Sequence, residues 1–562
     1  MTDPDRKVRI AMSSTLFLGG PIRTLADPTD LTADPPEALL VEDGMVTAAG
    51  TATELRRVAR NTALEIDLDG RTLFPGFVDA HAHTVLHGSR LDWVDLSDAK
   101  TIDDIVARLD ARVADRPGAG PVRGYGYDQS QLIDGRHPSA ADLDRVSRAR
   151  IVQIQHASGH GYVVNSLALQ QAGITRDTPT PAGGRIDRYE DGSPTGLVFD
   201  AACDLLTGVD GVKVTNHGPN FHLPMDHEEI DFLFDLGQRS FVRAGITTVC
   251  DAQVTELEMS AYLRARDEGR MRMRAEMLAL SSNLAHLEAL GLGSPLGDDR
   301  LRLRGVKFYA DGSVIARTAY LDPPTHENAC CDSPSPNGYL YHEPEELARL
   351  ILAAHRLGLP TATHAQGPTP IGIVLDAIAA GRAEHPRSAA IHRIEHCGFP
   401  TPQQITRMAE VGVVPVPQPM QVHLYADSLL AEFGDYGARF YPYGEFERAG
   451  LPVVISSDAP VTSPGPLRAV WAAMTRYTAH GEVAGGGDLR ASRAAALLGV
   501  TRTPARLLGR ADVGQLRAGA RADLVLLDAD PVTAQVDTLA HTAVTETWVN
   551  GTPAHAPAPA SA

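Results

Sequence analysis

The residues of this chain best suited to chemistry are four histidines, a lysine and an aspartate, each at the end of a short apolar segment. They are His81, His83, Lys307, His364, His396 and Asp458. The first two form a His-x-His motif directly after the apolar segment LFPGFVDA. Because side chains alternate along an extended chain, both imidazoles would lie on one side and reach the same metal ion. A lone buried histidine is more often structural, but six ligand-type residues in equivalent positions predict a metal centre.

Lys307 stands in the apolar segment GVKFYADGS, where a lysine is costly to bury unless its charge is paired or removed. One interpretation is a salt bridge at the end of a strand. The other is that the amine loses its proton and reacts with carbon dioxide to give a carbamate. The two oxygens of that carbamate would be able to bridge two metal ions.

Short apolar segments followed by helical patterns recur through the middle of the chain, as in βα units with a parallel sheet. The predicted strands cover residues 73–80, 245–252, 273–280, 304–311, 359–365, 390–396, 412–418 and 451–458. Eight is the number that closes a TIM (β/α)8 barrel, in which the carboxyl ends of the strands converge on one face. We therefore expect a metal-dependent TIM barrel over residues 73–514, with the six candidate ligands at its mouth.

The two ends of the chain differ from this middle part. Residues 1–72 and 515–562 contain short strand-like segments with hairpin signals such as Asp43-Gly44 and Asn550-Gly551. We expect them to form one small composite β-sandwich domain. The gap between the first two barrel strands is too long for a single βα connection. It predicts an inserted subdomain at about residues 88–235.

Composition limits the partners that this chain is expected to have. Its 562 residues carry a formal net charge of −19, which argues against a general nucleic-acid binder. The N-terminus lacks the apolar core of a signal peptide, and no apolar run reaches the roughly 18 residues needed to span a membrane. We therefore expect a cytoplasmic protein with a small-molecule substrate and no nucleic-acid or membrane partner.

The order His-x-His, Lys, His, His, Asp resembles that of the amidohydrolase superfamily. The phrases FPGFVDAHAH, GVKFYADGS, THAQG, RIEHC and SSDAPV are similar to those of the branch that contains N-substituted formamide deformylases. The resemblance extends over nearly the whole chain, including both β-rich ends, and it also implies a homodimer.

This resemblance implies two divalent metal ions, usually zinc. His81, His83 and Asp458 would hold one ion, His364 and His396 would hold the other, and carbamylated Lys307 would bridge them. The ions would lower the pKa of a shared water, and the resulting hydroxide would attack the substrate. Asp458 would take the proton from that water and deliver it to the leaving nitrogen.

Candidate substrate contacts are less specific. His160 lies in SGHGYVVNS, where the branch often has an acidic residue before Gly-His, and the alternative is a loop histidine that caps backbone groups. Asp128, Gln418 and Trp93 are weaker candidates. Tyr339 and Tyr341, in the segment 321–344 after Lys307, are expected to line the pocket together with Trp93. Asp79 is expected to orient one of the metal-binding imidazoles.

The predicted activity is hydrolysis of a C–N bond in an amide, an N-substituted formamide or a cyclic amide. A first alternative is deamination, or hydrolysis of an ester or carbamate, at the same metal site. A second alternative is a non-enzymatic metal-binding relative that kept the barrel. Asp458 argues against it, because a mere scaffold has no need of the proposed proton shuttle.

Overall fold

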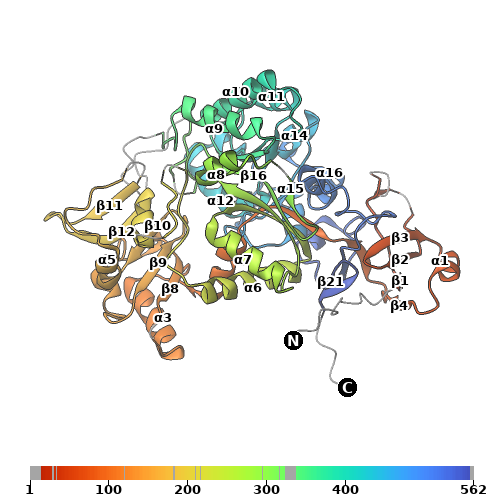
Figure 1. The fold of residues 1–562 in the computed structure, drawn as a ribbon, viewed down its shortest axis with the longest axis horizontal. Coiled ribbons are helices and arrows are strands. Elements are labelled where there is room, and N and C mark those ends of the chain that lie inside the picture. The colour runs from red at the N-terminus through yellow and green to blue at the C-terminus, as the bar shows by residue number, and fades with distance from the viewer. Residues whose placement is uncertain are drawn as a thin grey trace.

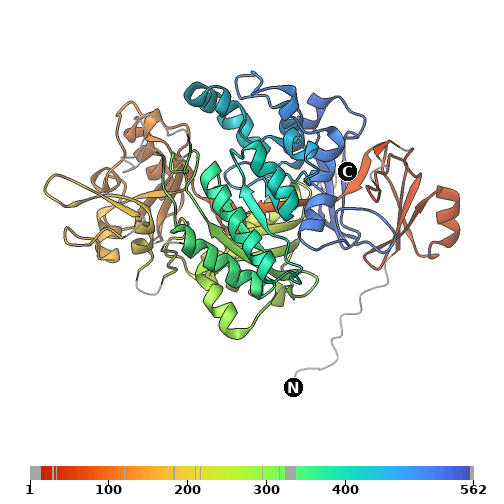
Figure 2. The same ribbon diagram turned by 90° about the horizontal axis from the view of Figure 1, so that it is seen from above.

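The computed structural model describes residues 14–556 except 28–30, 33, 119, 182–183, 209–210, 216, 294, 316 and 323–336. Figures 1 and 2 show three parts in a row: a central sheet wrapped by helices, a mixed sheet on one side, and two small sheets on the other. Most of the segment 321–344, which follows Lys307 and contains Tyr339 and Tyr341, lies outside the described residues.

The central part is a nearly closed parallel sheet of seven strands in a mixed α/β fold. Its order is β6, β13, β14, β16, β17, β18 and β19, with the short β15 (Leu296–Gly297) antiparallel to β16. The strands are β6 (Phe77–Ala82), β13 (Ile246–Val254), β14 (Arg274–Leu280), β16 (Leu301–Tyr309), β17 (Thr361–Ala365), β18 (Arg393–His396) and β19 (Val414–Val416).

Residues 451–458, predicted as the eighth strand, are not a strand in the structure. The segment closes the gap beside β6 through the bridge between Ala82 and Ala459 and through the Asp458 N–H, which donates to the His81 carbonyl at 2.8 Å. The Ile455 N–H instead donates to the carbonyl of Gly499, so no regular ladder forms along the segment.

Helices cover the outer face of this sheet (Figure 1). Five of them begin with proline, whose fixed φ and missing N–H suit the first helical turn. In α9, Leu347, Leu350, Ile351 and Ala354 are buried at the spacing of one helical face. The helices are α2 (Thr84–Asp92), α6 (His227–Arg243), α7 (Glu256–Asp267), α8 (Leu284–Leu290), α9 (Pro344–Arg356), α10 (Pro368–Glu384), α11 (Pro402–Val411), α12 (Pro419–Phe433), α13 (Asp435–Ala438), α14 (Tyr443–Arg448), α15 (Pro466–Thr475), α16 (Arg493–Gly499) and α17 (Arg502–Leu507).

Both chain ends contribute to the two small sheets. One sheet has the order β3, β2, β1, β4, and the other has the order β22, β21, β20, β5. They share an apolar core in which Phe17 packs edge-on against Trp548 at 5.3 Å between ring centroids. Their elements are β1 (Ser14–Leu18), β2 (Ala38–Glu42), β3 (Met45–Gly50), α1 (Ala52–Val58), β4 (Leu64–Asp67), β5 (Thr72–Pro75), β20 (Leu524–Leu527), β21 (Val544–Val549) and β22 (Thr552–His555).

The first predicted barrel strand, residues 73–80, is divided at Gly76. β5 ends before this glycine and pairs with β20, whereas β6 begins after it and pairs with β13. A Cβ on Gly76 would lie 2.4 Å from the Thr247 hydroxyl oxygen, so the chain passes between the two sheets only because residue 76 has no side chain.

The third part lies between α2 and α6 in the chain and forms a sheet in the order β11, β12, β10, β9, β8, β7. It is the orange and yellow region of Figure 1. Its elements are β7 (Val94–Asp95), α3 (Ile102–Asp115), β8 (Val122–Tyr127), α4 (Ala140–Leu143), β9 (Val152–His156), β10 (Gly161–Val164), α5 (Ser166–Ala172), β11 (Gly184–Arg188) and β12 (Pro194–Asp200).

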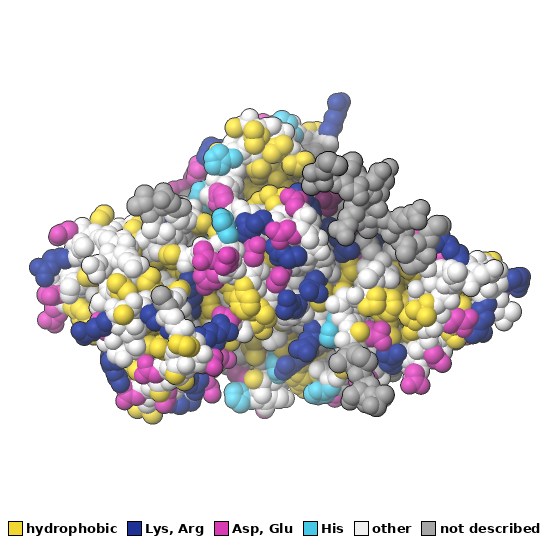
Figure 3. Space-filling model, turned by 60° about the horizontal axis from the view of Figure 1, so that its bottom comes forward, with side chains coloured by type: hydrophobic (Ala, Val, Ile, Leu, Met, Phe, Trp, Pro, Cys, Tyr) yellow, Lys and Arg dark blue, Asp and Glu magenta, His cyan; other side chains and the backbone are white. Residues whose placement is uncertain are grey.

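Basic and acidic side chains are interspersed, with apolar patches between them, over the face drawn in Figure 3. Within the described residues, every helix is too short or too polar to traverse a bilayer.

Candidate metal centre

One cavity at the carboxyl ends of the central strands is lined by all six predicted ligands. Its volume is about 260 Å³. All six side chains are buried, and they come from different parts of the chain because the parallel strands end on the same face of the sheet. They are His81, His83, Lys307, His364, His396 and Asp458.

Asp458 lies at the centre of the group. Its Oδ1 is 3.4 Å from His81 Nε2 and 3.3 Å from His83 Nε2, and its Oδ2 is 4.0 Å from His396 Nδ1. One ligand-type atom from each of His81, His396 and Asp458 lies within 4.8 Å of the other two. Burial alone would raise the pKa of Asp458, but hydrogen bonds from His81 and His83 outweigh it and hold the pKa well below its usual value. Imidazole nitrogens around a carboxylate are a donor set that suits zinc.

Two of these residues have left-handed backbone conformations. The φ angle is 63° at His396 and 54° at Asp458, in a region that non-glycine residues avoid. Such a conformation costs about 1–3 kcal/mol per residue and persists where the surrounding structure fixes it. Here it places both side chains in the cavity as the chain leaves the sheet.

Three of the four candidate imidazoles are oriented by a hydrogen bond on one ring nitrogen. Nδ1 of His81 bonds to the Glu395 carboxylate, which leaves Nε2 for the cavity. Nε2 of His364 bonds to the carbonyl of Gly312 at 2.8 Å, which leaves Nδ1. Nδ1 of His396 bonds to Gln418 Oε1 at 2.7 Å, which leaves Nε2. Each ring therefore keeps one nitrogen available to a ligand, as metal-binding histidines do.

Lys307 is fully buried, and its Nζ has no hydrogen-bond partner within the described part of the chain. Nζ lies 4.7 Å from the centroid of the Tyr309 ring and makes no ion pair with a described carboxylate. Burial lowers the pKa of Lys307 to about 8, with nearby Glu395 and Asp458 opposing the shift. Of the two interpretations made from sequence, the salt bridge is therefore wrong.

The pattern of a known family covers most of the chain. The sequence model of a protein family described as "Amidohydrolase family" matches residues 64–555. The chain belongs to the amidohydrolase family. The resemblance inferred from the sequence motifs is thereby confirmed, as is the expectation of an enzyme.

Relatives of this amidohydrolase match it over most of its length. An N-substituted formamide deformylase from Arthrobacter pascens is 30% identical over 530 residues, which cover 92% of this chain and 94% of the relative. The putative amidohydrolase YtcJ from Bacillus subtilis is 29% identical, over 83% of this chain and 84% of the relative. A crystal structure of an uncharacterized metal-dependent hydrolase from Pyrococcus furiosus superposes with a TM-score of 0.74 at 26% identity, covering 92% of this chain and 100% of that one.

Asp79 and Gln418 do not line the cavity of this amidohydrolase, but both bind segments that carry candidate ligands. Asp79 accepts hydrogen bonds from the backbone N–H groups of His81 and Ser457, at 3.2 and 3.1 Å, so it joins two ligand-bearing segments rather than orienting an imidazole. Gln418 was a weak candidate for substrate binding, but it does not line the cavity. Its carbonyl oxygen holds His396, and its amide donates to Ser456 at 3.0 Å.

His160 lines the same cavity as the six ligands. Its Nδ1 lies 2.8 Å from Asp200 Oδ1, and the other Asp200 oxygen accepts a hydrogen bond of 2.5 Å from the Tyr339 hydroxyl. The side chain of His160 is thus held by a carboxylate and does not cap a backbone group. Asp200 has a φ of 49°, at the junction between β12 and the turn that follows it.

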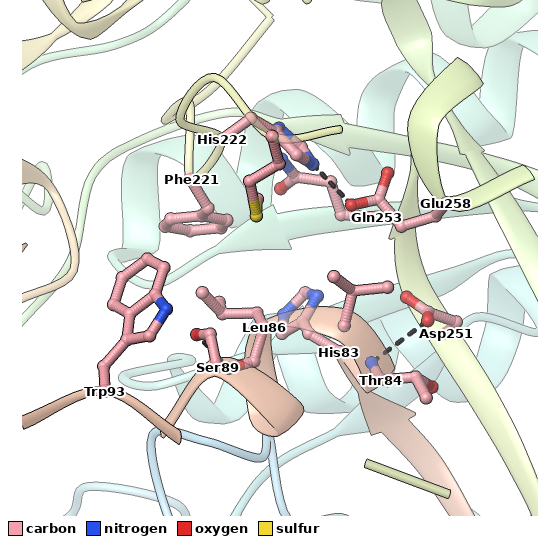
Figure 4. A pocket seen from close by; sticks show the side chains of 12 residues that line it. His83, Thr84, Leu86, Ser89, Trp93, Phe221, His222, Asp251, Gln253 and Glu258 are labelled. Carbon is pink, nitrogen blue, oxygen red and sulfur yellow. Dashed lines mark hydrogen bonds and ion pairs between the residues drawn. The ribbon is translucent and has the colours of Figure 1, made fainter. Parts of the chain in front are cut away.

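The other two weak candidates lie outside this cavity. Trp93 lines a smaller pocket of about 20 Å³ behind His83, where Figure 4 shows it facing Phe221. Arg123 stacks over the Trp93 ring at 5.5 Å. Asp128 accepts hydrogen bonds from the N–H and the hydroxyl of Ser130, at 2.8 and 2.7 Å, and so closes a turn. Neither residue lines the cavity of the six candidate ligands, so contact of Trp93 or Asp128 with substrate stays a prediction.

The small pocket also contains an ion pair that the motifs did not reveal. His222 Nε2 lies 2.5 Å from Glu258 Oε1, and both side chains are buried (Figure 4). Burial would lower the pKa of His222, but the Glu258 carboxylate outweighs it and raises the pKa. Burial would raise the pKa of Glu258, and His222 together with Thr255 lowers it to about 2.

Proposed function

We propose that this amidohydrolase hydrolyses a C–N bond in an amide, an N-substituted formamide or a cyclic amide, using two divalent metal ions, most simply zinc. The observation that supports this most strongly is the convergence of six ligand-type side chains on one cavity, with an unpaired and fully buried lysine among them. Carbamylated Lys307 would bridge the ions. His81, His83 and Asp458 would hold one of them, and His364 and His396 the other.

The donor set fits such ions. His81, His364 and His396 each have one ring nitrogen engaged by the protein and the other available, and Lys307 Nζ is a buried polar atom without a partner among the described residues. Bound divalent ions supply a water of lowered pKa and polarise a carbonyl group. Asp458, whose carboxylate lies between His81 and His83 at the centre of the group, would accept the proton of that water. It would then deliver that proton to the leaving nitrogen.

The proposal extends to the fold that carries the site. We interpret residues 451–458 as the eighth segment of a (β/α)8 barrel, because they bridge to β6 at Ala459 and donate to His81. We interpret the two terminal sheets as one composite β-sandwich, because they share the core that contains Phe17 and Trp548.

The decisive experiment is elemental analysis of metal-supplemented wild type, Lys307→Ala and Lys213→Ala. Lys213 is the matched control, since its Nζ bonds to the Asp204 carbonyl at 2.7 Å and does not line the cavity. We expect about two ions per chain in wild type and in Lys213→Ala, and fewer in Lys307→Ala. Equal metal content in all three proteins would refute the bridging role.

Product analysis separates the reaction types. Formate or another carboxylate released together with an amine from N-substituted formamides and N-acyl amines would support the proposed hydrolysis. Ammonia released from aminated rings would instead assign the site to a deaminase.

A further inference from the structure

Arg90 lines the same cavity as the candidate metal ligands, although no motif pointed to it. It lies on α2, which begins immediately after His83. His83, Leu86 and Arg90 follow one another at intervals of three and four residues, so they share one helix face, and all three line the cavity. Seven residues of helix span about 10 Å, so the guanidinium is within reach of a small molecule held at the metal centre.

The Arg90 guanidinium has no hydrogen-bond or ion-pair partner among the described residues. Its carbon lies 4.4 Å from the centroid of the Tyr125 ring, which fixes the plane of the group. Its Nη1 is buried and unpaired. Burial lowers the pKa of Arg90 to about 10, so the group is still charged at neutral pH.

An unpaired cation next to a cavity is unfavourable by itself, because a buried charge needs a counter-charge and hydrogen-bond acceptors. Arginines whose side chains are buried do have such partners; Arg274, for example, forms an ion pair of 2.9 Å with Asp523. A ligand with an anionic group would complete the environment of Arg90. A planar guanidinium matches a carboxylate in particular, since it can donate two parallel hydrogen bonds.

We propose that Arg90 binds a carboxylate of the substrate, so that the enzyme acts on amides that carry an acid group, such as N-formyl or N-acyl amino acids. This inference rests on the proposed function. Phe221, Tyr309 and Tyr425 line the same cavity and provide apolar surface for the body of such a molecule. One water hydrolyses an N-formyl amino acid to formate and the free amino acid, with the leaving nitrogen taking up a proton.

The test compares two substrates that differ only in the acid group, N-formylphenylalanine and N-formylphenethylamine. An arginine–carboxylate contact is a hydrogen bond between charged groups, for which wild type should prefer the acid by about ten- to a hundred-fold in kcat/KM. We expect Arg90→Gln to abolish this preference and Arg90→Lys to retain part of it, because lysine keeps the charge without the planar fork.

Arg185→Gln is the matched control. Arg185 also stacks on an aromatic ring, with its guanidinium carbon 5.4 Å from the centroid of Phe199, but it does not line the cavity. It should keep the wild-type preference. A second measurement, titration of wild type and Arg90→Gln with the non-hydrolysable acid 4-phenylbutanoate, tests the contact without catalysis. Binding should weaken in Arg90→Gln by the same factor as the preference falls.

The outcomes separate this inference from the proposed function. If both formamides are hydrolysed equally well by wild type and by Arg90→Gln, the carboxylate contact is refuted while C–N hydrolysis stands. If neither is hydrolysed by metal-loaded enzyme, the N-substituted formamide activity is refuted, and the titration decides whether Arg90 is an anion site. Equal binding of 4-phenylbutanoate to both proteins would refute it.

Discussion

Replacing Glu395 by glutamine should weaken metal binding and lower stability at the same time. The carboxylate is fully buried between two donors, His81 Nδ1 on one side and the Arg393 guanidinium on the other, with Arg393 Nη2 at 2.8 Å. Burial would raise the pKa of Glu395, but Arg393 and His81 hold it well below its usual value. A glutamine amide has one accepting oxygen and presents an N–H₂ group to one of the two donors.

The magnitude follows from what each neighbour loses. Arg393 is left as a buried cation without its carboxylate, a change that costs about 3–5 kcal/mol of unfolding free energy. His81 loses the charged acceptor that fixes its ring, which lowers metal affinity by about ten- to a hundred-fold. The first effect concerns the whole fold and the second only the metal centre.

A remote ion pair provides the matched control for this experiment. Glu276 is also fully buried, and one of its oxygens lies 3.2 Å from Arg510, but it does not line the cavity. Urea unfolding of metal-free protein should show a loss of stability in both Glu395→Gln and Glu276→Gln. Competition for zinc with a chelator, under conditions where both variants are folded, should show a loss of metal affinity in Glu395→Gln alone.

Two results would refute this reasoning. Unchanged zinc affinity in Glu395→Gln would mean that its hydrogen bond to His81 does not support the metal. An equal loss of affinity in Glu276→Gln would mean that metal binding follows global stability and not the orientation of one ring.

Two further predictions concern the neighbouring networks. Asp200→Asn should reduce kcat/KM by about ten-fold, because His160 loses its charged hydrogen-bond acceptor. Thermal stability should change little, because asparagine tolerates the positive φ of this position. Unchanged kcat/KM in this variant would show that the contact between His160 and Asp200 is dispensable for activity. His222→Gln should destabilise the protein more at about pH 5.5 than at about pH 9. The folded protein raises the pKa of His222, so the charged histidine stabilises the fold fully at a pH below its pKa in the unfolded chain, which is 6.5. This contribution is lost as the pH rises through the pKa of the folded state. Urea unfolding at the two pH values measures the difference, and an equal loss at both would contradict a charged His222–Glu258 pair.

The cluster of six candidate ligands was predictable from sequence because these residues occupy positions that the local pattern exposes. The His-x-His motif, the buried lysine and the residues at strand ends needed only the rule that parallel strands end on one face. The same rule placed seven of the eight predicted central strands in one sheet. Residues 451–458 lie beside β6 but do not form the predicted strand, because the Ile455 N–H bonds to Gly499, and periodicity alone does not reveal that partner.

The residues around the metal centre depended on contacts between distant segments. Glu395 is 314 positions from His81, and Tyr339 is 139 positions from Asp200, so no local spacing links either pair. Gln418 was a candidate for substrate contact from the sequence, and only the structure shows that its oxygen bonds to His396, 22 positions away. Arg90 had no motif, and its significance appeared only when the tertiary structure left it without a counter-charge.

The sequence by itself determined the candidate donor residues and their order, because ligand chemistry and strand alternation are local properties of the chain. Only the tertiary structure decided which nitrogen of His81, His364 and His396 is available, which buried charges are paired, and that the sheet between α2 and α6 brings His160 to the cavity. These features depend on long-range packing and on the satisfaction of buried polar groups, which are properties of the whole fold and not of any one segment.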